Sequence, residues 1–266
     1  MNQQDFLYEL QLHSAAAFFD LTSKDGRHAS VKAVEHFFFQ LCNVFSPQLF
    51  VEAGAEDARV SRRARRYLPE ARIVAFEANP HNFETHEPRL NKKDRIEYLN
   101  LALDEDSGSV QFQLQVEVGG SAVDVREGSH SLLKRADAVA RYEQISVPAV
   151  SLDQFFAGPI APCVLWIDVE GATGRVLSGA RAVLGAASHL IIEVEDRAIW
   201  SEQWLRSQVM AFLRDAGFTP VARDFQSRYQ YNVLFVRTTL LEKDRFRHTL
   251  ATYFSTIGSR CRAPVE

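Results

Sequence analysis

The sequence predicts an α/β fold, with a mostly parallel β-sheet and helices on both of its faces. Short apolar runs rich in Val, Ile and Phe alternate along the chain with segments of helical periodicity. Such runs are typical of strands that are buried on both faces, which requires helices to cover the sheet. The predicted strands span residues 49–51, 73–76, 96–101, 163–169 and 189–194, and the helices between them span residues 59–68, 82–91 and 174–184.

Further elements are predicted at both ends of the chain. Residues 5–19 have apolar side chains at helical spacing, and Ser30 is a candidate cap for a helix that runs to residue 45. Residues 23–30 are polar, include Gly26 and are expected to connect these helices. Strands 218–223 and 232–237 flank turn-forming residues, and helix 240–254 follows. The expected organisation is an N-terminal helical extension (1–47), a main domain (48–238) and a C-terminal helix and tail (239–266).

Residues 104–150 interrupt the alternation of strands and helices. Residues 109–116 alternate with period two and residues 145–150 form a short apolar run, so each is predicted to be a strand. The span is too long for a simple crossover, and we interpret it as a functional insertion or lid. His130, in the run Ser129-His130-Ser131, is a candidate general base, with an ordinary loop residue as the alternative.

The composition is that of an ordinary globular protein and gives no global electrostatic case for nucleic-acid binding. The 266 residues are 46% hydrophobic and carry a formal net charge of -4. The three cysteines are far apart and lack metal-ligand spacing, as expected of reduced thiols. No apolar run reaches the ~18 residues of a membrane helix, and the first residues lack a signal-peptide pattern. We expect a soluble, cytoplasmic protein.

Gly54 and Glu77 have the spacing of a nucleotide-binding βαβ unit. Gly54 follows the first strand, and Glu77 ends the second strand 23 residues later. An acid at that distance can accept hydrogen bonds from both ribose hydroxyls. Glu52 and Glu56 flank the glycine, which disfavours a pyrophosphate and suits a ligand with a positive end. The alternatives are a simple tight turn at Gly54 and an acid that caps the next helix, although Asn79 could equally be that cap.

A second group of acids follows two later strands. Asp168 and Glu170 lie at the end of strand 163–169, where ligands bind in open α/β sheets. They could orient a substrate, act as a base or hold a metal, and the alternative is hydrogen bonding to the next loop. Glu193, Glu195 and Asp196 end strand 189–194, where solvation is as good an explanation as a substrate role.

Two clusters are given structural interpretations. Four arginines of helix 59–68 recur at i, i+3, i+4 and i+7 and form one face, namely Arg59, Arg62, Arg63 and Arg66. We interpret this face as solvated, with contact to an anionic partner as the alternative, and expect Val60, Ala64 and Tyr67 or Leu68 to point inward. The run 37–39 (Phe-Phe-Phe) is interpreted as core or as a dimer surface, so a homo-oligomer stays open.

Six motifs in this order resemble those of the FkbM-type S-adenosylmethionine-dependent methyltransferases, and the resemblance covers about residues 49–237. They begin with Val51-Glu-Ala-Gly-Ala-Glu, Phe76-Glu-Ala-Asn-Pro and the run 101–108, and continue with the run 150–155, Trp166-Ile-Asp-Val-Glu-Gly-Ala and the run 176–180. The resemblance implies a class I methyltransferase (Rossmann-like) fold with seven strands, one of them antiparallel. It also implies S-adenosylmethionine as cofactor.

The resemblance also assigns residues to a cofactor site and a reaction centre. It places Glu52, Gly54, Ala55 and Glu56 around the methionine part and Glu77 on the ribose, and it assigns Ala78 and Asn79 to cofactor binding. It places Ala102 and Asp104 near the adenine, and Asp168 and Glu170 at the reaction centre. The chain departs from the family pattern at five positions: Glu52 replaces Asp, Glu56 replaces Asn, Ala58 replaces Gly, Trp166 replaces Lys and Thr173 replaces an acid.

The function implied is O-methylation of a hydroxyl on a sugar, glycolipid or polyketide-like acceptor. Asp168, Glu170 or His130 would take the hydroxyl proton, and no metal site is expected. The insertion 104–150 and the N-terminal helices would form the pocket for a small-molecule or saccharide acceptor. The alternatives are a catalytically inactive binding module with this fold, and a nicotinamide-dependent oxidoreductase, although the glycine-rich phosphate loop of the latter is lacking.

Overall fold

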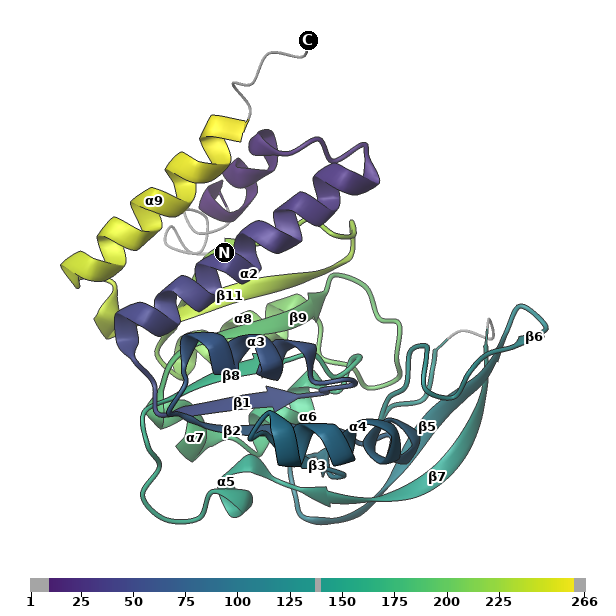
Figure 1. Ribbon diagram of the computed structural model, residues 1–266. Coiled ribbons are helices and arrows are strands. Elements are labelled where there is room, and N and C mark those ends of the chain that lie inside the picture. Colours follow the sequence, from purple (N-terminus) through teal and green to yellow (C-terminus); the bar gives the residue numbers. More distant parts are fainter. Residues whose placement is uncertain (1–9, 137–139, 261–266) are drawn as a thin grey trace.

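The computed structural model, which describes residues 10–136 and 140–260, contains a seven-stranded β-sheet with helices on both faces (Figure 1). Its strand order is β10-β11-β9-β8-β1-β2-β3. All neighbours pair in parallel except β11, which is antiparallel to β9 and β10, so the predicted mostly parallel sheet is confirmed. The strands are β1 (Leu49–Ala53), β2 (Arg72–Phe76), β3 (Glu97–Leu99), β8 (Cys163–Ile167), β9 (Ala187–Glu195), β10 (Phe218–Arg223) and β11 (Gln230–Arg237).

The register of the parallel strands brings three strand ends together at the carboxyl edge of the sheet. Ala53, the last residue of β1, lies opposite Phe76 of β2 and Ile167 of β8. Both β1 and β8 are buried along their whole length, as expected of central strands covered on two faces. The residues that follow these three ends are Gly54, Glu77 and Asp168, and the sheet therefore places them side by side.

Helices cover the two faces of the sheet and form two separate cores. One face carries α2 (Lys24–Phe45), α3 (Arg59–Tyr67), α4 (Pro80–Lys93) and α9 (Asp244–Arg260). The other face carries α5 (Leu152–Phe155), α6 (Thr173–Ser178), α7 (Arg181–Ala186) and α8 (Arg206–Asp215). The first and last long helices, α2 and α9, lie side by side above the sheet (Figure 1). The division into an extension, a main domain and a tail stays a prediction.

The long helix α2 begins earlier than the sequence predicted. Its N-cap is Ser23, whose hydroxyl oxygen accepts a hydrogen bond from the Gly26 amide at 3.0 Å. Gly26 therefore lies in the first turn of the helix and not in a connector. Only glycine fits there, because a Cβ atom would lie 1.9 Å from the Asp20 carbonyl oxygen. Ser30, the predicted cap, is instead buried inside the helix, and its hydroxyl oxygen accepts from the Phe225 amide at 2.9 Å. Before α2, residues 10–14 are helical and continue into η1 (Ala15–Phe18), while residues 5–9 of the predicted helix lie outside the described residues.

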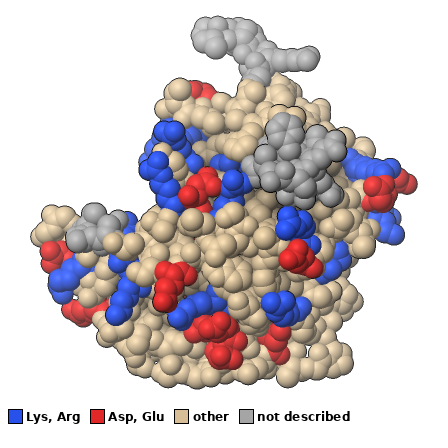
Figure 2. Space-filling view, turned by 180° about the vertical axis from the view of Figure 1, so that it is seen from behind, with Lys and Arg blue, Asp and Glu red and all other residues tan. Residues whose placement is uncertain are grey.

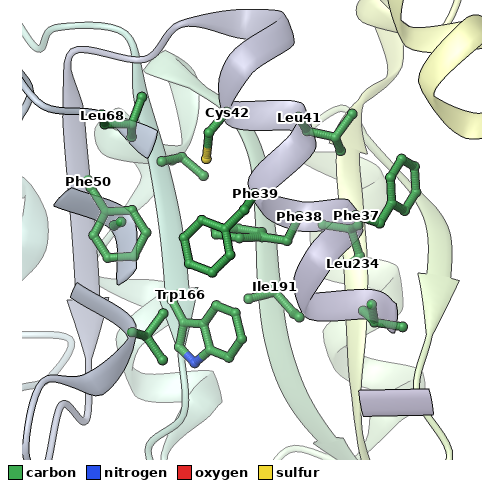
Figure 3. Packing of buried hydrophobic residues seen from close by; sticks show 14 of the residues in the cluster. Phe37, Phe38, Phe39, Leu41, Cys42, Phe50, Leu68, Trp166, Ile191 and Leu234 are labelled. Carbon is green, nitrogen blue, oxygen red and sulfur yellow. The ribbon is translucent and has the colours of Figure 1, made fainter. Parts of the chain in front are cut away.

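The aromatic run of α2 forms core against the sheet (Figure 3). The Phe38 ring meets the Trp166 indole of β8 edge-on, with 5.3 Å between ring centroids and an interplanar angle of 90°. Phe37 and Phe39 are equally buried, and Phe37 stacks on Tyr253 of α9 at 4.6 Å. Aromatic pairs in these geometries add about 0.5–1.5 kcal/mol each to the burial of their surface. The interpretation of residues 37–39 as core is therefore confirmed.

The insertion builds a second, smaller sheet beside the first. Its strands are β4 (Ala102–Leu103), β5 (Gly108–Val118), β6 (Ser121–Ala122) and β7 (Ala140–Val150), in the order β4-β7-β5-β6. The antiparallel pair β5–β7 is longer than the two predicted strands and projects to one side of the main sheet (Figure 1). Phe112 and Leu114 of β5 pack on Val147 and Ala149 of β7, so the alternating pattern gives this sheet its own apolar face.

Three other predicted elements differ from the structure. The helix predicted over residues 174–184 is two short helices, α6 and α7, because the chain at Gly179 passes close to a neighbouring segment. A Cβ atom on Gly179 would lie 2.4 Å from the Asp104 carbonyl oxygen. The last helix begins at Asp244, after a turn of 3-10 helix η2 (Thr238–Leu240), and not at residue 240. The third strand is shorter than predicted and spans Glu97–Leu99.

The arginine face of α3 is largely neutralised by ion pairs. Arg59 and Arg63 contact the carboxylate of Glu35 on α2 at 3.1 and 2.5 Å, and Arg62 contacts Asp57 at 2.5 Å. The predicted inward residues of this helix, Val60, Ala64 and Leu68, are buried. Figure 2 shows basic and acidic side chains interspersed over the face seen from behind, without one extended basic patch. Arg59 and Arg66 are exposed, as the solvated interpretation predicts, and the ion pairs of Arg59 and Arg63 also tie α3 to α2.

Candidate functional site

A cavity of about 190 Å³ lies at the carboxyl edge of the main sheet, between the ends of β1, β2 and β8 and the second sheet. Eight of the predicted site residues line it: Gly54, Glu56, Glu77, Ala78, Ala102, His130, Asp168 and Glu170. The insertion supplies further walls, including Phe112, Arg126, Gly128, Ser131 and Leu132. The cavity is therefore enclosed by elements that are far apart in the sequence.

The loop after β1 passes very close to the end of β8. Gly54 has a φ of 77°, and a Cβ atom on it would lie 1.8 Å from the Asp168 carbonyl oxygen. Only glycine allows this approach. The next residues are also in the left-handed region, with φ of 47° at Glu56 and 52° at Ala58. Strained non-glycine residues of this kind cluster at ligand sites, where the surrounding structure must hold them.

The Glu77 carboxylate holds that loop in place. One of its oxygens accepts from the Glu56 amide and the other from the Asn79 amide, both at 2.7 Å. The Tyr98 hydroxyl donates to the Glu56 carbonyl oxygen and fixes the same loop from the other side. Burial is the main cause that raises the pKa of Glu77 to about 7. Each carboxylate oxygen keeps a second lone pair, so Glu77 can also accept from a ligand hydroxyl in the cavity.

Four predicted cofactor residues are not among those that line the cavity, and their roles stay predictions. Ala55 is buried, and its amide donates to the Phe76 carbonyl oxygen at 3.0 Å. Asn79 caps α4 by accepting from the His81 amide at 3.0 Å, and its Nδ2 atom donates to the Val125 carbonyl oxygen at 2.7 Å. Asp104 is buried and pairs with Arg175 at 3.2 Å. The fourth residue is Glu52.

Glu52 points beneath α3 and away from the cavity. Its carboxylate accepts from the Ser61 amide at 2.8 Å, and the residue is 2% exposed. Burial raises the pKa of Glu52 to about 8 from a usual value of 4.5. At neutral pH the folded state therefore holds a proton that the unfolded state has lost.

Replacing Glu52 by glutamine is expected to make stability less dependent on pH. The stabilisation from the raised pKa is fully present below pH about 4.5 and is lost as the pH rises through about 8. Glutamine keeps an oxygen for the Ser61 amide and carries no charge. Relative to wild type, Glu52→Gln should change the free energy of unfolding little at pH 5 and should raise it at pH 9 by about 1–4 kcal/mol. Urea unfolding at both pH values measures this, with the exposed Glu84→Gln as control. A difference that does not change with pH would contradict it.

Asp168 and Glu170 lie side by side in the cavity after β8, next to further acids after β9. Burial, with nearby Asp224 and Glu56, raises the pKa of Asp168 to about 6. Burial, with Asp168 and Glu195, raises the pKa of Glu170 to about 8, and Glu170 has a φ of 45°. Because each carboxylate disfavours ionisation of the other, the pair takes its first negative charge more readily than its second. Two neighbouring carboxyl groups with separated pKa values can serve as a base and a hydrogen-bond donor.

His130 lines the cavity, but its hydrogen bonding suits a donor better than a base. Its Nδ1 atom accepts from the Gln115 amide at 2.9 Å, which places the proton of the neutral ring on Nε2. The Nε2 atom is buried and has no hydrogen-bond partner within the described residues. Burial also lowers the pKa of His130, which favours the neutral ring. The base role predicted for His130 would require the bond from Gln115 to break.

A segment formed by residues 131–136, which we call the strap, runs from the wall of the cavity to the loop after β9. The Ser131 hydroxyl donates to the Glu170 carbonyl oxygen at 2.6 Å. Farther along, the Ala136 amide donates to Ile199 and the Ser201 amide donates to Lys134, at 2.9 and 2.8 Å. Leu133, which belongs to the strap, packs on Ala172 and Trp200. The sequence did not predict that residues 199–201 lie beside the site. They are placed there by hydrogen bonds to the strap, and no sequence motif marks pairing between two loops.

Two departures from the family pattern lie away from the cavity. The Trp166 side chain points into the core between the sheet and α2 (Figure 3). Thr173 is buried, and its hydroxyl donates to the Glu193 carbonyl oxygen at 3.4 Å. Neither residue lines the cavity. These departures therefore do not remove a group from the candidate site.

A comparison with protein families decides what kind of protein this is. Residues 52–220, more than half of the chain, match the model of the Methyltransferase FkbM domain. The chain belongs to the FkbM methyltransferase family. The matched region contains the last two residues of β1, the second sheet and the acids of the candidate site, and the strand order of the main sheet is that of the class I methyltransferase fold. The cofactor of this FkbM methyltransferase is S-adenosylmethionine.

The chain is similar to several individual methyltransferases. It is 23% identical over 165 residues to the 2-O-methyltransferase NoeI of Sinorhizobium fredii (strain NBRC 101917 / NGR234), a match that covers 58% of this chain and 66% of NoeI. Among solved structures, magnesium protoporphyrin IX methyltransferase (ChlM) from Synechocystis PCC 6803 matches with a TM-score of 0.44 and 10% identity, covering 82% of this chain and 84% of that one. A SAM dependent methyltransferase from Aquifex aeolicus matches with a TM-score of 0.41 and 11% identity, covering 89% of this chain and 100% of that one.

The donor groups around the cavity fit this cofactor. Glu77 offers carboxylate lone pairs for a ribose, and Glu56 offers negative charge to the positively charged methionine part. Leu101, Leu103 and Phe112 give apolar surface for an adenine ring.

Within the described residues, no group of three or more His, Cys, Asp and Glu side chains is placed to hold a metal ion. In the same part of the chain, no helix is both long and apolar enough to cross a membrane.

Proposed function

We propose that this FkbM methyltransferase transfers a methyl group to a hydroxyl oxygen of a sugar, glycolipid or polyketide-like acceptor. The observation that carries the proposal is the pair Asp168 and Glu170, whose carboxyl groups line the cofactor cavity at the carboxyl edge of the sheet. A hydroxyl nucleophile must lose a proton during transfer, and a carboxylate within reach can take it. The similarity to a 2-O-methyltransferase supports oxygen as the methylated atom.

In the reaction that we propose, the chain positions two reactants and removes one proton. S-adenosylmethionine supplies an electrophilic methyl group when bound. Glu77 would hold the ribose, and Glu56 would lie near the positive end of the methionine part. Asp168 would accept the hydroxyl proton as the O–CH₃ bond forms and the S–CH₃ bond breaks, which leaves a methyl ether and a thioether. Glu170, whose pKa is raised by burial and by Asp168, would donate a hydrogen bond to the acceptor in its protonated form. Most of the rate enhancement would come from orientation, which can supply about 7–11 kcal/mol.

Calorimetric titration with S-adenosylmethionine and S-adenosylhomocysteine tests the cofactor half of this proposal. We expect micromolar binding to the wild type and a loss of at least about tenfold in Glu77→Ala, because one carboxylate positions both the loop and the ribose. The exposed residue Glu84 on α4 gives the matched control Glu84→Ala, which should bind like the wild type. Thermal unfolding verifies that each variant is folded. Equal binding by Glu77→Ala and the wild type would contradict the assignment of the ribose site.

Transfer of a radiolabelled methyl group to a panel of hydroxyl compounds tests the acceptor half. The panel would contain methyl pyranosides, glycolipids and macrocyclic alcohols, and mass spectrometry would locate the new methyl group. Methylation at oxygen is the expected outcome. Methylation only at nitrogen or carbon of other acceptors would refute O-methylation while leaving the methyltransferase family unaffected.

A further inference from the structure

Beside the cavity, three buried polar side chains at the end of β9 and in the loop that follows have atoms without hydrogen-bond partners within the described residues. Both carboxylate oxygens of Glu195 are unpartnered, although the residue is only 1% exposed. The indole Nε1 atom of Trp200, 1% exposed, and the amide Nε2 atom of Gln203, 7% exposed, are also unpartnered. Buried polar groups are nearly always hydrogen-bonded, and each unmade bond costs about 1–3 kcal/mol. Three such residues in one short segment therefore require an explanation.

The orientation of the Gln203 amide is fixed by the backbone. Its oxygen accepts from the Ile199 amide at 2.8 Å and from the Trp200 amide at 3.1 Å. A flipped amide would point its nitrogen at two N–H donors, so the NH₂ group is the end that remains available. Gln203 is near enough to Glu195 to lower the pKa of that carboxyl group, yet no bond of ordinary geometry joins them.

These three groups adjoin the proposed reaction centre. The Trp200 indole lies against Gly171, where a Cβ atom would meet its Cδ1 atom at 2.3 Å and its Nε1 atom at 3.1 Å. Gly171 directly follows Glu170 in the chain. Glu195 is close enough for its charge to act on both Asp168 and Glu170. We call Glu195, Trp200 and Gln203 the β9 triad. Through Trp200, the triad contacts Gly171, the residue that follows Glu170 in the chain.

The β9 triad matches the hydrogen-bonding capacity of a hydroxyl group. Glu195 can only accept when ionised, whereas the Trp200 and Gln203 nitrogens can only donate. A hydroxyl is both a donor and an acceptor, so one hydroxyl can satisfy the carboxylate and a nitrogen together. We propose that the β9 triad binds a second hydroxyl of the acceptor, adjacent to the one that is methylated. This inference rests on the proposed O-methyltransferase function, and it names the acceptor class as a vicinal diol.

Access to the triad passes the strap. Leu133 of the strap covers Trp200, and the strap is paired with residues 199 and 201 on either side of that indole. A diol would therefore reach Glu195 when this pairing opens, and it would be shielded from water when the pairing closes. Water exclusion strengthens the hydrogen bonds that a carboxylate makes to a bound hydroxyl.

Binding measurements with Glu195→Gln test the proposal without requiring turnover. The probes are methyl pyranosides that have vicinal hydroxyls and their monodeoxy counterparts, titrated onto the S-adenosylhomocysteine complex by calorimetry. We expect the wild type to bind at least one diol at least about tenfold more tightly than its deoxy counterpart, and Glu195→Gln to lose that preference. Glu202→Gln is the matched control, because this neighbouring carboxylate is exposed. Thermal unfolding should show Glu195→Gln to be at least as stable as the wild type without ligand, because an unpaired buried carboxylate is removed.

Each other outcome is also decisive. Equal diol preference in the wild type and Glu195→Gln would overturn the proposal and would mean that the triad holds only a trapped water. Absence of saturable binding by every glycoside to an enzyme that binds the cofactor would overturn it as well. Failure of the proposed function itself would appear differently, as an absence of S-adenosylmethionine binding or as methyl transfer to an atom other than oxygen.

Discussion

Gly54→Ala is expected to weaken S-adenosylmethionine binding by more than about 100-fold and to destabilise the fold by several kcal/mol. The added Cβ atom would lie 1.8 Å from the Asp168 carbonyl oxygen, far inside any van der Waals contact. Because both partners are backbone of adjacent strands, no side-chain rotation can relieve the clash. The φ of 77° adds a penalty of its own for any residue with a Cβ atom. Calorimetric titration and urea unfolding measure the two effects.

Gly185→Ala is the matched control for this substitution. Gly185 lies in α7, and nothing lies within 4 Å of the position that its Cβ atom would take. Alanine in a helix is favoured over glycine by about 0.5–1 kcal/mol, so the control should be as stable as the wild type or slightly more so. If Gly54→Ala bound the cofactor as well as Gly185→Ala does, the close approach of β1 and β8 would not form the cofactor site.

Asp168→Asn is expected to lower kcat by about 10²–10⁴-fold while cofactor binding changes much less. Asparagine keeps the size of the side chain but cannot take a proton. Because the pKa of Asp168 is raised to about 6, the wild-type kcat should rise with pH through that value and then level off above it. The profile is measured with whichever acceptor the panel identifies. In Asp168→Asn the rising limb should be absent.

Glu170→Gln distinguishes the role of Glu170 from that of Asp168. Burial and Asp168 raise the pKa of Glu170 to about 8, so its hydrogen-bond donor is lost as the pH rises through that value. The wild-type kcat should therefore fall above pH about 8, whereas Glu170→Gln, whose amide donates at every pH, should show no falling limb. Survival of the falling limb in Glu170→Gln, or an unaltered rising limb in Asp168→Asn, would show that the two roles are assigned wrongly.

The sheet could be predicted from the sequence because its signals are local. Each central strand is a short apolar run, and β1 and β8 need no partner to be recognised. Helix ends were harder, because they depend on contacts made elsewhere in the chain. Ser30 resembles a cap in the sequence, but its hydroxyl is taken by Phe225, which is 195 residues away. The break between α6 and α7 likewise depends on the close approach of Asp104 to Gly179.

The candidate site was predictable where one strand end and one residue type define it. Gly54, Glu77 and Asp168 follow three adjacent parallel strands, so their convergence follows from the sheet order alone. Glu52 has the same chemistry, but side chains alternate along a strand and its carboxylate points beneath α3. Trp200 and Gln203 could not be found, because the position of their loop depends on its pairing with the strap and on the contact between Trp200 and Gly171, which no local pattern encodes.

The main sheet and the second sheet contribute different residues to the cavity. The main sheet supplies Glu77, Asp168 and Glu170, and the second sheet supplies part of the apolar wall. The ends of β1, β2 and β8 form one side of the cavity. The segment between β5 and β7 is joined to that side by a few hydrogen bonds, among them those from Asn79 to Val125 and from Ser131 to Glu170. Residues of the insertion that do not line the cavity, such as the exposed strand β6, can be exchanged without moving Gly54, Glu77 or Asp168. A chain built in this way can acquire new acceptors during evolution through substitutions in its insertion while its chemistry stays the same.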